Sequence, residues 1–399
     1  MAIFRAFKAF RPAQRNQALI PALPYDVMSS EEARQMVRGN SLSFLHVDRA
    51  EIDLPLGADK YSENTGAMIQ DKTPCLYIYR QIMNGRVQVG IVGCASIDDY
   101  MNNVIKKHEK TLAKKEKDRI NHVHTTNANT GPIFLTYRKN ASINMTVSLW
   151  MNEREPVYNF EADGVLQTVW VIDDIETINR LTSLFKEVKA LYIADGHHRC
   201  ASAVRVGQMR REENPDYTGD EEFNYFLAVA FPDDELEIMD YNRVVKDLND
   251  LSADEFLSRV FEKFEIKKEE APYHPIEKHT FGMYLDKEWY SLKAKKSIIN
   301  ENDPVARLDV SILQENLLDP ILGIRDPKND SRIDFIGGIR GLTELERRAK
   351  TDMKLAFSMY PTTTDDLIAI ADAGQIMPPK STWFEPKLLS GLFIHHLSD

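Results

Sequence analysis

The sequence predicts an α/β protein of the mixed α+β kind. Short apolar runs bounded by turn residues, such as residues 191–194 and 223–231, are typical of buried strands. Between such runs lie amphipathic helical patterns, of which residues 174–189 are the clearest. Asn84-Gly85 and Asp163-Gly164 each stand between two apolar runs, which is typical of β-hairpin turns. These observations favour sheets built partly from hairpins and covered by helices.

The length of the chain predicts two domains. The 399 residues are 43% hydrophobic and 28% charged, which is enough apolar material for a large core. The pattern changes near Asp240, so we expect one domain over residues 1–239 and an α/β region over 240–399 that closes over the functional site. Both hairpins fall in the N-terminal domain. The sequence pattern favours no particular oligomeric state.

Charge and composition exclude several classes of function. The 50 Lys and Arg residues and 61 Asp and Glu residues give a net charge of −11, which makes nucleic acid an unlikely partner. Residues 1–17 lack the apolar run of a signal peptide, and no run of eighteen apolar residues occurs, so we expect a cytoplasmic protein without a membrane partner. Three scattered cysteines predict neither a disulfide framework nor a zinc knot, and we expect no haem, flavin or zinc.

The remaining elements follow from caps and periodicity. From Ser96 a capped helical segment is expected to continue, with a break, through Lys106 to Asn127. The amphipathic helix at 174–189 leads into the apolar strand at 191–194, which gives the order helix, strand, helix. In the C-terminal region the patterns predict a helix that begins near residue 252, strands at 280–285, 289–292 and 354–360, and helices at 309–318 and 362–373.

Five polar residues at the end of the 191–194 strand are the strongest functional signal: Asp195, Gly196, His197, His198 and Arg199. A strand that turns into a helix there exposes the free N–H groups and positive dipole end of the helix, which attract an anion. Gly196 lets the backbone approach closely, Arg199 offers a forked guanidinium, and the imidazoles add donors near neutral pH. The alternatives are an ordinary tight turn with the histidines capping the helix, and a metal site, which lacks a further His or Cys at chelating spacing.

A second cluster of charged residues spans residues 106–119. On a continuous helix Glu109 and Glu116 are seven residues apart and share a face, with Arg119 three residues further on. Two such carboxylates are suited to holding Mg²⁺ or taking a proton from a hydroxyl, while Arg119 or Lys107 neutralises phosphate charge. The alternative is a solvated helix face.

Three more residues are candidates for substrate contacts. Asp26 lies in the loop just before a helix that Ser29 and Glu32 are expected to cap, and a second capping carboxylate is the alternative. Lys380 follows two prolines, and Lys387 follows Pro386. A lysine held by prolines suits a phosphate or carboxylate contact, and exposed lysines in a turn are the alternative.

The loop resembles the phosphate loop of the ParB/sulfiredoxin superfamily, and its Asp-Gly-His-His-Arg form is most similar to that of the free-serine kinases. The whole chain resembles the DUF1015 family of SpoOJ/ParA/ParB/RepB-like uncharacterised proteins. The motifs that carry the wider resemblance are residues 23–27, 107–111, 115–119, 194–199 and 377–382. The resemblance implies a ParB/sulfiredoxin-like N-terminal part, and it points to His108, Glu109, Glu116, Asp118 and Arg119 as catalytic residues.

The function that this resemblance implies is nucleotide-dependent phosphoryl transfer to a small hydroxylated metabolite. Residues 195–199 would bind the nucleotide phosphate, ADP or ATP would be the nucleotide, and Glu109 and Glu116 would hold Mg²⁺. The acidic motif stands about eighty residues before the loop, further than in the small kinases. The alternative is a ParB-like nucleotide-binding regulator without metabolite turnover. Sulfiredoxin chemistry is disfavoured because His197 stands where that loop carries its reactive cysteine.

Overall fold

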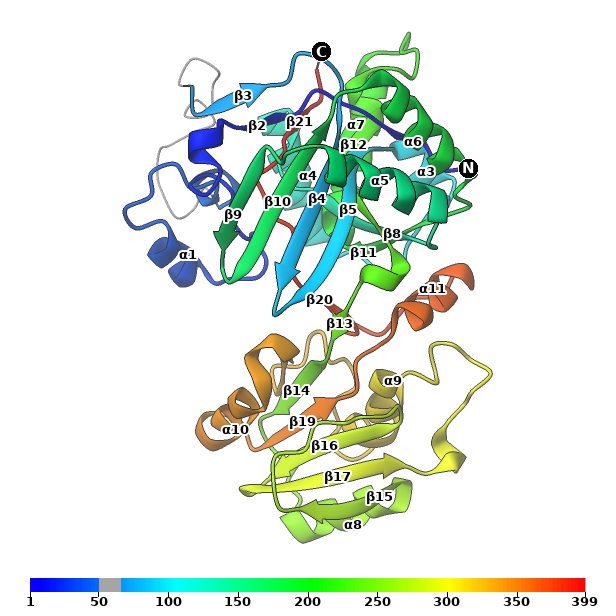
Figure 1. Cartoon of the computed structure of the whole chain (residues 1–399). Helices are drawn as coiled ribbons and strands as arrows, with labels where there is room; N and C mark the ends of the chain where they lie inside the picture. The colour runs from blue at the N-terminus through cyan, green and yellow to red at the C-terminus, as the bar shows by residue number, and fades with distance from the viewer. Residues whose placement is uncertain (50–65, 399) are drawn as a thin grey trace. The chain divides into compact units, whose positions relative to one another are not determined.

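The computed structural model describes residues 1–49 and 66–398 of the chain (Figure 1). It forms two compact units, one of Met1–Leu236 together with Pro386–Asp399 and the other of Glu237–Glu385. The chain thus leaves the first unit after Leu236 and returns to it at Pro386. The α/β class predicted from the sequence is confirmed by the order of helices and strands.

The first unit is built on a sheet that has nine strands within the described residues, in the order β6-β11-β8-β12-β5-β4-β10-β9, with β1 added on β5. Strands β11 and β6 are parallel, as are β12 and β8, and the other pairs are antiparallel. The sheet strands are β1 (Phe4–Arg5), β4 (Leu76–Met83), β5 (Arg86–Ser96), β6 (Ile105–Lys106), β8 (Ile133–Tyr137), β9 (Tyr158–Ala162), β10 (Val165–Ile172), β11 (Leu191–Asp195) and β12 (Tyr225–Pro232).

Both hairpins predicted from the sequence are confirmed. Strands β4 and β5 are joined by Asn84 and Gly85, whose φ angles are 52° and 81°. Strands β9 and β10 are joined by Asp163 and Gly164, with φ angles of 51° and 76°. Positive φ at both central residues is the conformation that matches the twist of the flanking strands, and Asn, Asp and Gly adopt it most readily.

Helices α5, α6 and α7 contribute buried side chains to the core beside this sheet. The predicted helix at 174–189 is α6, which Asp174 caps by accepting from the Thr177 backbone N–H, and its residue Phe185 stacks on Phe4 at 4.6 Å between ring centroids. The helices of the unit are α1 (Ser30–Met36), α2 (Leu45–Asp48), α3 (Ile97–Met101), α4 (Ala113–Thr126), α5 (Ala141–Glu153), α6 (Ile175–Glu187) and α7 (His197–Glu213). Two small sheets pair β2 (Phe10–Pro12) with β3 (Met68–Gln70) and β7 (Ala128–Asn129) with β21 (His395–His396).

The prediction of a helix continuing through Lys106 to Asn127 is wrong in its first part. Ile105 and Lys106 form β6, which pairs with Leu191 and Tyr192 of β11, and Ile105 is fully buried in the core. Residues 107–112 form a loop, and α4 begins only at Ala113. Burial of Ile105 in the sheet outweighs the helical propensity of the charged residues that follow it. Glu109 and Glu116 therefore do not lie on one continuous helix.

The second unit holds a sheet in the order β15-β17-β16-β19-β14-β18, antiparallel at every pairing that the described residues make. Two of its helices begin with capping boxes, at Ser252 and at Thr363. The predicted start near residue 252 is confirmed, and the start predicted at residue 362 is correct to within one residue. The strands are β13 (Ile238–Met239), β14 (Tyr241–Val245), β15 (Phe264–Glu269), β16 (Thr280–Leu285), β17 (Glu288–Ala294), β18 (Ile333–Gly337), β19 (Leu355–Met359) and β20 (Trp383–Phe384); the α-helices are α8 (Ala253–Lys263), α9 (Asp309–Leu313), α10 (Gly341–Thr351) and α11 (Thr364–Asp372).

Short helical turns complete both units. The 3-10 turns span Gln14–Asn16, Glu222–Asn224, Asp233–Glu235, Lys296–Ile298 and Gly338–Arg340, and a π-helical turn spans Gln314–Leu318. In the part of the chain that the structure describes, none of the helices combines the length and the apolar character needed to cross a membrane.

Two phenylalanines of α8 provide a matched test of this packing. Phe256 is 0% exposed, whereas Phe261 on the same helix is 61% exposed. We predict that Phe256→Ala lowers the free energy of unfolding of the second unit by about 3–5 kcal/mol, because it leaves a cavity in the core. Phe261→Ala should change it by only about 0.5 kcal/mol. Urea unfolding followed by tryptophan fluorescence measures both, and equal losses would contradict the assigned core.

Candidate functional site

The junction of β11 and α7 has the geometry that the sequence predicts. Strand β11 ends at Asp195, Gly196 caps the helix with a φ of 91°, and α7 begins at His197. A side chain at Gly196 would be strained, and its Cβ would lie 3.3 Å from Arg199 Nε. Glycine therefore allows both the turn and the close approach of the Arg199 guanidinium to the backbone.

Asp195 is held between two cations. Its Oδ1 accepts a hydrogen bond of 2.7 Å from the Gly196 backbone N–H, and its Oδ2 lies 3.0 Å from Lys387 Nζ. Burial alone would raise the pKa of Asp195, but the charges of Lys387 and Arg199 hold that pKa well below its usual range. Asp195 is therefore ionised, and its negative charge would repel a phosphate. Its role is to hold Lys387 and Arg199 in position.

Arg199 has a buried donor that is not used. Its Nη1 donates to the Pro132 carbonyl at 3.0 Å, while its buried Nε has no hydrogen-bond partner among the described residues. Burial lowers the pKa of Arg199, but the charges of Asp26 and Asp195 outweigh this effect and raise it, so the guanidinium is charged. A buried charged donor without a partner is costly, which makes Arg199 Nε a candidate contact for an anionic ligand.

Arg199 and Arg119 line the same small cavity, of about 30 Å³. The Arg119 guanidinium stacks 3.9 Å above the Tyr25 ring and donates to Asp118 at 2.7 and 2.9 Å. The Asp118 side chain is 66% exposed, so its contact with Arg119 lies at the surface. The structure thus brings the predicted arginine of α4 and the predicted arginine of α7 to one place.

Further polar groups line this cavity, among them His122, Thr130 and Asp48. His122 Nε2 lies 2.9 Å from Thr130 Oγ1 and 3.7 Å from Asp48 Oδ1. Burial lowers the pKa of His122 below its ordinary value, which favours the neutral ring. The cavity therefore combines two guanidinium groups with a neutral imidazole and the Asp48 carboxylate.

On its other side the start of α7 meets the loop at 107–112. The rings of His108 and His197 lie edge to face, with centroids 4.4 Å apart, and His197 Nδ1 is 3.5 Å from Glu109 Oε2. Burial lowers the pKa of His108 to about 4 and that of His197 well below its usual value. Both rings are therefore neutral at pH 7.

Hydrogen bonds fasten this loop and α4 to α7. His198 Nε2 accepts from the Leu112 backbone N–H at 3.0 Å, and Ser202 Oγ lies 3.2 Å from the Glu116 carbonyl. The Glu116 carboxylate accepts from Thr111 Oγ1 at 2.8 Å. The two charged clusters predicted from the sequence, although far apart along the chain, are thus joined in the first unit.

Two other predicted residues make different contacts. Lys107 Nζ stands 4.2 Å over the Tyr100 ring. Lys380 belongs to the second unit, where its carbonyl accepts from Arg243 Nη2 at 3.0 Å. Their proposed substrate contacts stay predictions, as does closure of the site by the C-terminal region.

No role was predicted for four groups around the site: Tyr25, Asp48, His122 and Thr130. His122 follows Arg119 by three residues and so shares its helix face, a signal that could have identified it. Nothing local distinguishes Asp48 or Thr130, since their place beside His122 results from contacts between distant segments.

The residues present do not assemble a metal centre by themselves. Among residues 1–49 and 66–398, no group of three or more His, Cys, Asp or Glu side chains is placed to hold a metal ion. Glu109 contacts His197 and Glu116 contacts Thr111, so the two carboxylates have different neighbours. Magnesium commonly takes only one or two protein carboxylates and completes its shell with phosphate oxygens and water, so Mg²⁺ would fit here only together with a phosphate ligand.

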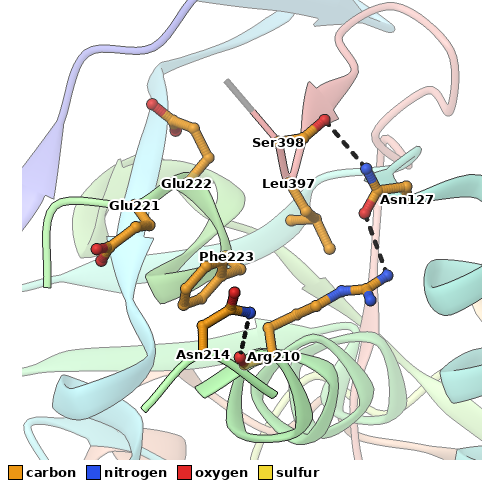
Figure 2. Close-up of a pocket in the computed structure, with 8 residues that line it drawn as sticks. All are labelled: Asn127, Arg210, Asn214, Glu221, Glu222, Phe223, Leu397 and Ser398. Atoms are coloured by element: carbon orange, nitrogen blue, oxygen red, sulfur yellow. Dashed lines mark hydrogen bonds between the residues drawn. The ribbon is translucent and has the colours of Figure 1, made fainter. Parts of the chain in front are cut away.

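A second, larger cavity of about 400 Å³ lies beside the C-terminal residues (Figure 2). Asn127 Nδ2 donates to Ser398 Oγ at 3.1 Å, and Arg210 Nη2 donates to Asn127 Oδ1 at 3.3 Å (Figure 2). Arg210 is also paired with Glu213 at 3.0 Å. Because these polar groups already bind one another, the start of α7, with its unpartnered donor, is the better candidate site.

Comparison with solved structures gives several distant similarities. A free serine kinase in complex with AMP is 13% identical, with a TM-score of 0.39 over 77% of this chain and 93% of that chain. SbnI with a C-terminal truncation, from Staphylococcus aureus, is 9% identical, with a TM-score of 0.40 over 75% of this chain and 85% of that chain. A conserved hypothetical protein from Pyrococcus furiosus is 12% identical, with a TM-score of 0.36 over 77% of this chain and 97% of that chain.

Among curated protein sequences none matches significantly. The family model described as "Protein of unknown function (DUF1015)" matches residues 4–311, which is more than half of the chain. The chain therefore belongs to the DUF1015 family.

Proposed function

We propose that this protein binds ADP or ATP through a phosphate at the start of α7 and transfers a phosphoryl group to a small hydroxylated metabolite. The observation that carries the proposal is that Arg119 and Arg199 line one small cavity although they come from different helices. Two guanidinium groups that line one space suit a doubly charged phosphate, because Arg199 Nε is a donor without a partner among the described residues and Arg119, whose Nε and Nη2 donate to Asp118, adds a second positive charge.

The backbone supports the same assignment. A helix of seventeen residues begins at His197, and its first N–H groups and dipole favour an anion at this end. The unpartnered Arg199 Nε supplies a further charged donor. Asp195 offsets part of the positive charge and holds Lys387 within 3.0 Å, so that two cations stay fixed before a ligand arrives. Preorganised charge of this kind is the main contribution that a protein makes to phosphoryl transfer.

We assign Glu116 as the carboxylate that binds Mg²⁺ together with phosphate oxygens. It stands on α4, whose residue Arg119 lines the cavity, and its carbonyl contacts Ser202 of α7. When bound, the ion would neutralise the charge that develops on the phosphate. A ParB-like regulator that binds a nucleotide without turnover is the alternative, and measured turnover separates the two.

The first test of the proposal is Arg199→Ala. Loss of a guanidinium from a phosphate contact costs about 1.5–3 kcal/mol, which weakens binding of ADP or ATP by roughly 10- to 150-fold. Arg205→Ala is the matched control, because Arg205 lies on the same helix but points to Glu212 at the surface. Isothermal titration calorimetry with ADP and ATP measures both variants, and circular dichroism checks their folding. Equal affinity in wild type and Arg199→Ala would contradict the phosphate site.

The second test concerns Glu116→Gln, which keeps the shape of the side chain and removes its charge. We predict at least a 100-fold loss of nucleotide turnover and loss of its dependence on Mg²⁺, while nucleotide affinity stays within a few-fold. Glu212→Gln, at a carboxylate that is 68% exposed, is the control and should leave turnover unchanged. Full Mg²⁺-dependent turnover in Glu116→Gln would remove this residue from the proposal.

A further inference from the structure

The pair of buried histidines beside the loop has more hydrogen-bonding capacity than the described residues satisfy. His108 is 2% exposed and His197 is 4% exposed. Both ring nitrogens of His108 and Nε2 of His197 have no hydrogen-bond partner among the described residues. A buried polar atom without a partner destabilises the fold, so a site that retains three of them is suited to a polar ligand group.

The surroundings of His197 determine which nitrogen carries its proton. The Glu109 carboxylate lies 3.5 Å from Nδ1, and a negative charge on that side favours the tautomer with N–H at Nδ1. The lone pair then remains on Nε2, which is the buried atom without a partner. The edge-to-face contact with His108, at an interplanar angle of 85°, restrains the ring in this orientation.

His197 is also close to the phosphate site along the chain. It is the first residue of α7, and Arg199 follows in the same helical turn. The Arg199 side chain points to the other face of the helix, so the link is the backbone: the first N–H of α7 belongs to His197 itself, and a phosphate bound at these N–H groups would lie beside the residue that carries the base.

We propose that His197 is the catalytic residue that accepts the proton of the metabolite's hydroxyl group, and that Glu109 is its positioning residue. This inference rests on the proposed phosphoryl transfer. In the step, the O–H bond breaks and its proton goes to His197 Nε2, while the hydroxyl oxygen forms a bond to the terminal phosphorus of the nucleotide. The bond from that phosphorus to the bridging oxygen breaks, and its electron pair leaves with the shortened nucleotide. Glu109 stabilises the imidazolium that forms.

The tautomer can be measured without any substrate. In protein labelled with ¹⁵N-histidine, the His197 resonances are identified by their loss in His197→Gln. The expected result at pH 7 is a neutral ring with its proton on Nδ1, and a shift toward the Nε2–H tautomer in Glu109→Gln. A wild-type proton on Nε2 would overturn the inference and leave the proposed function intact.

The kinetic arm uses ATP or ADP with Mg²⁺ and a panel of small alcohols, hydroxy acids and hydroxy amino acids as acceptors. His197→Gln should lower nucleotide consumption at least 100-fold, with the nucleotide dissociation constant within threefold of wild type, because general base catalysis contributes about 10²–10⁴. His124→Gln, at an exposed histidine of α4, should match wild type. Wild-type rates in a folded His197→Gln would refute His197 as the base, and a wild-type protein without any nucleotide consumption would refute the proposed function together with it.

Discussion

The candidate site depends on one charged contact, the pairing of the Asp195 carboxylate with Lys387. The Lys387 side chain is 9% exposed, so its ammonium group needs the carboxylate to stay charged at that depth. Lys387 arrives from the last segment of the chain, which returns to the first unit at Pro386. The same carboxylate helps to keep the Arg199 guanidinium charged. A single ionised aspartate thus lies beside two cations at the start of α7, and these cations are the groups that would bind an anion in the proposed function.

The first turn of α7 faces two chemical environments. Arg199 borders a small cavity that contains a second guanidinium, from Arg119 of α4. His197 instead contacts the neutral ring of His108 and the carboxylate of Glu109. The proposed division of labour follows from this arrangement, because charge stabilisation requires permanent cations and proton transfer requires a neutral base.

Local signals predicted much of the fold. The hairpins at Asn84-Gly85 and Asp163-Gly164 and the strand, turn and helix around Gly196 were predictable because short stretches determine them. The prediction of a helix through Lys106 was wrong because Ile105 and Lys106 pair with β11, and this contact joins segments more than eighty residues apart. For the same reason the pairing of Lys387 with Asp195, separated by 192 residues, could not be derived from spacing.

The most direct measurement is a crystal structure of the protein with Mg²⁺ and a non-hydrolysable ATP analogue. The proposed phosphate site requires a phosphate group within hydrogen-bonding distance of Arg199 Nε and of backbone N–H groups in the first turn of α7, roughly 2.7–3.2 Å away. A nucleotide bound elsewhere, with the first turn of α7 free of phosphate, would contradict it.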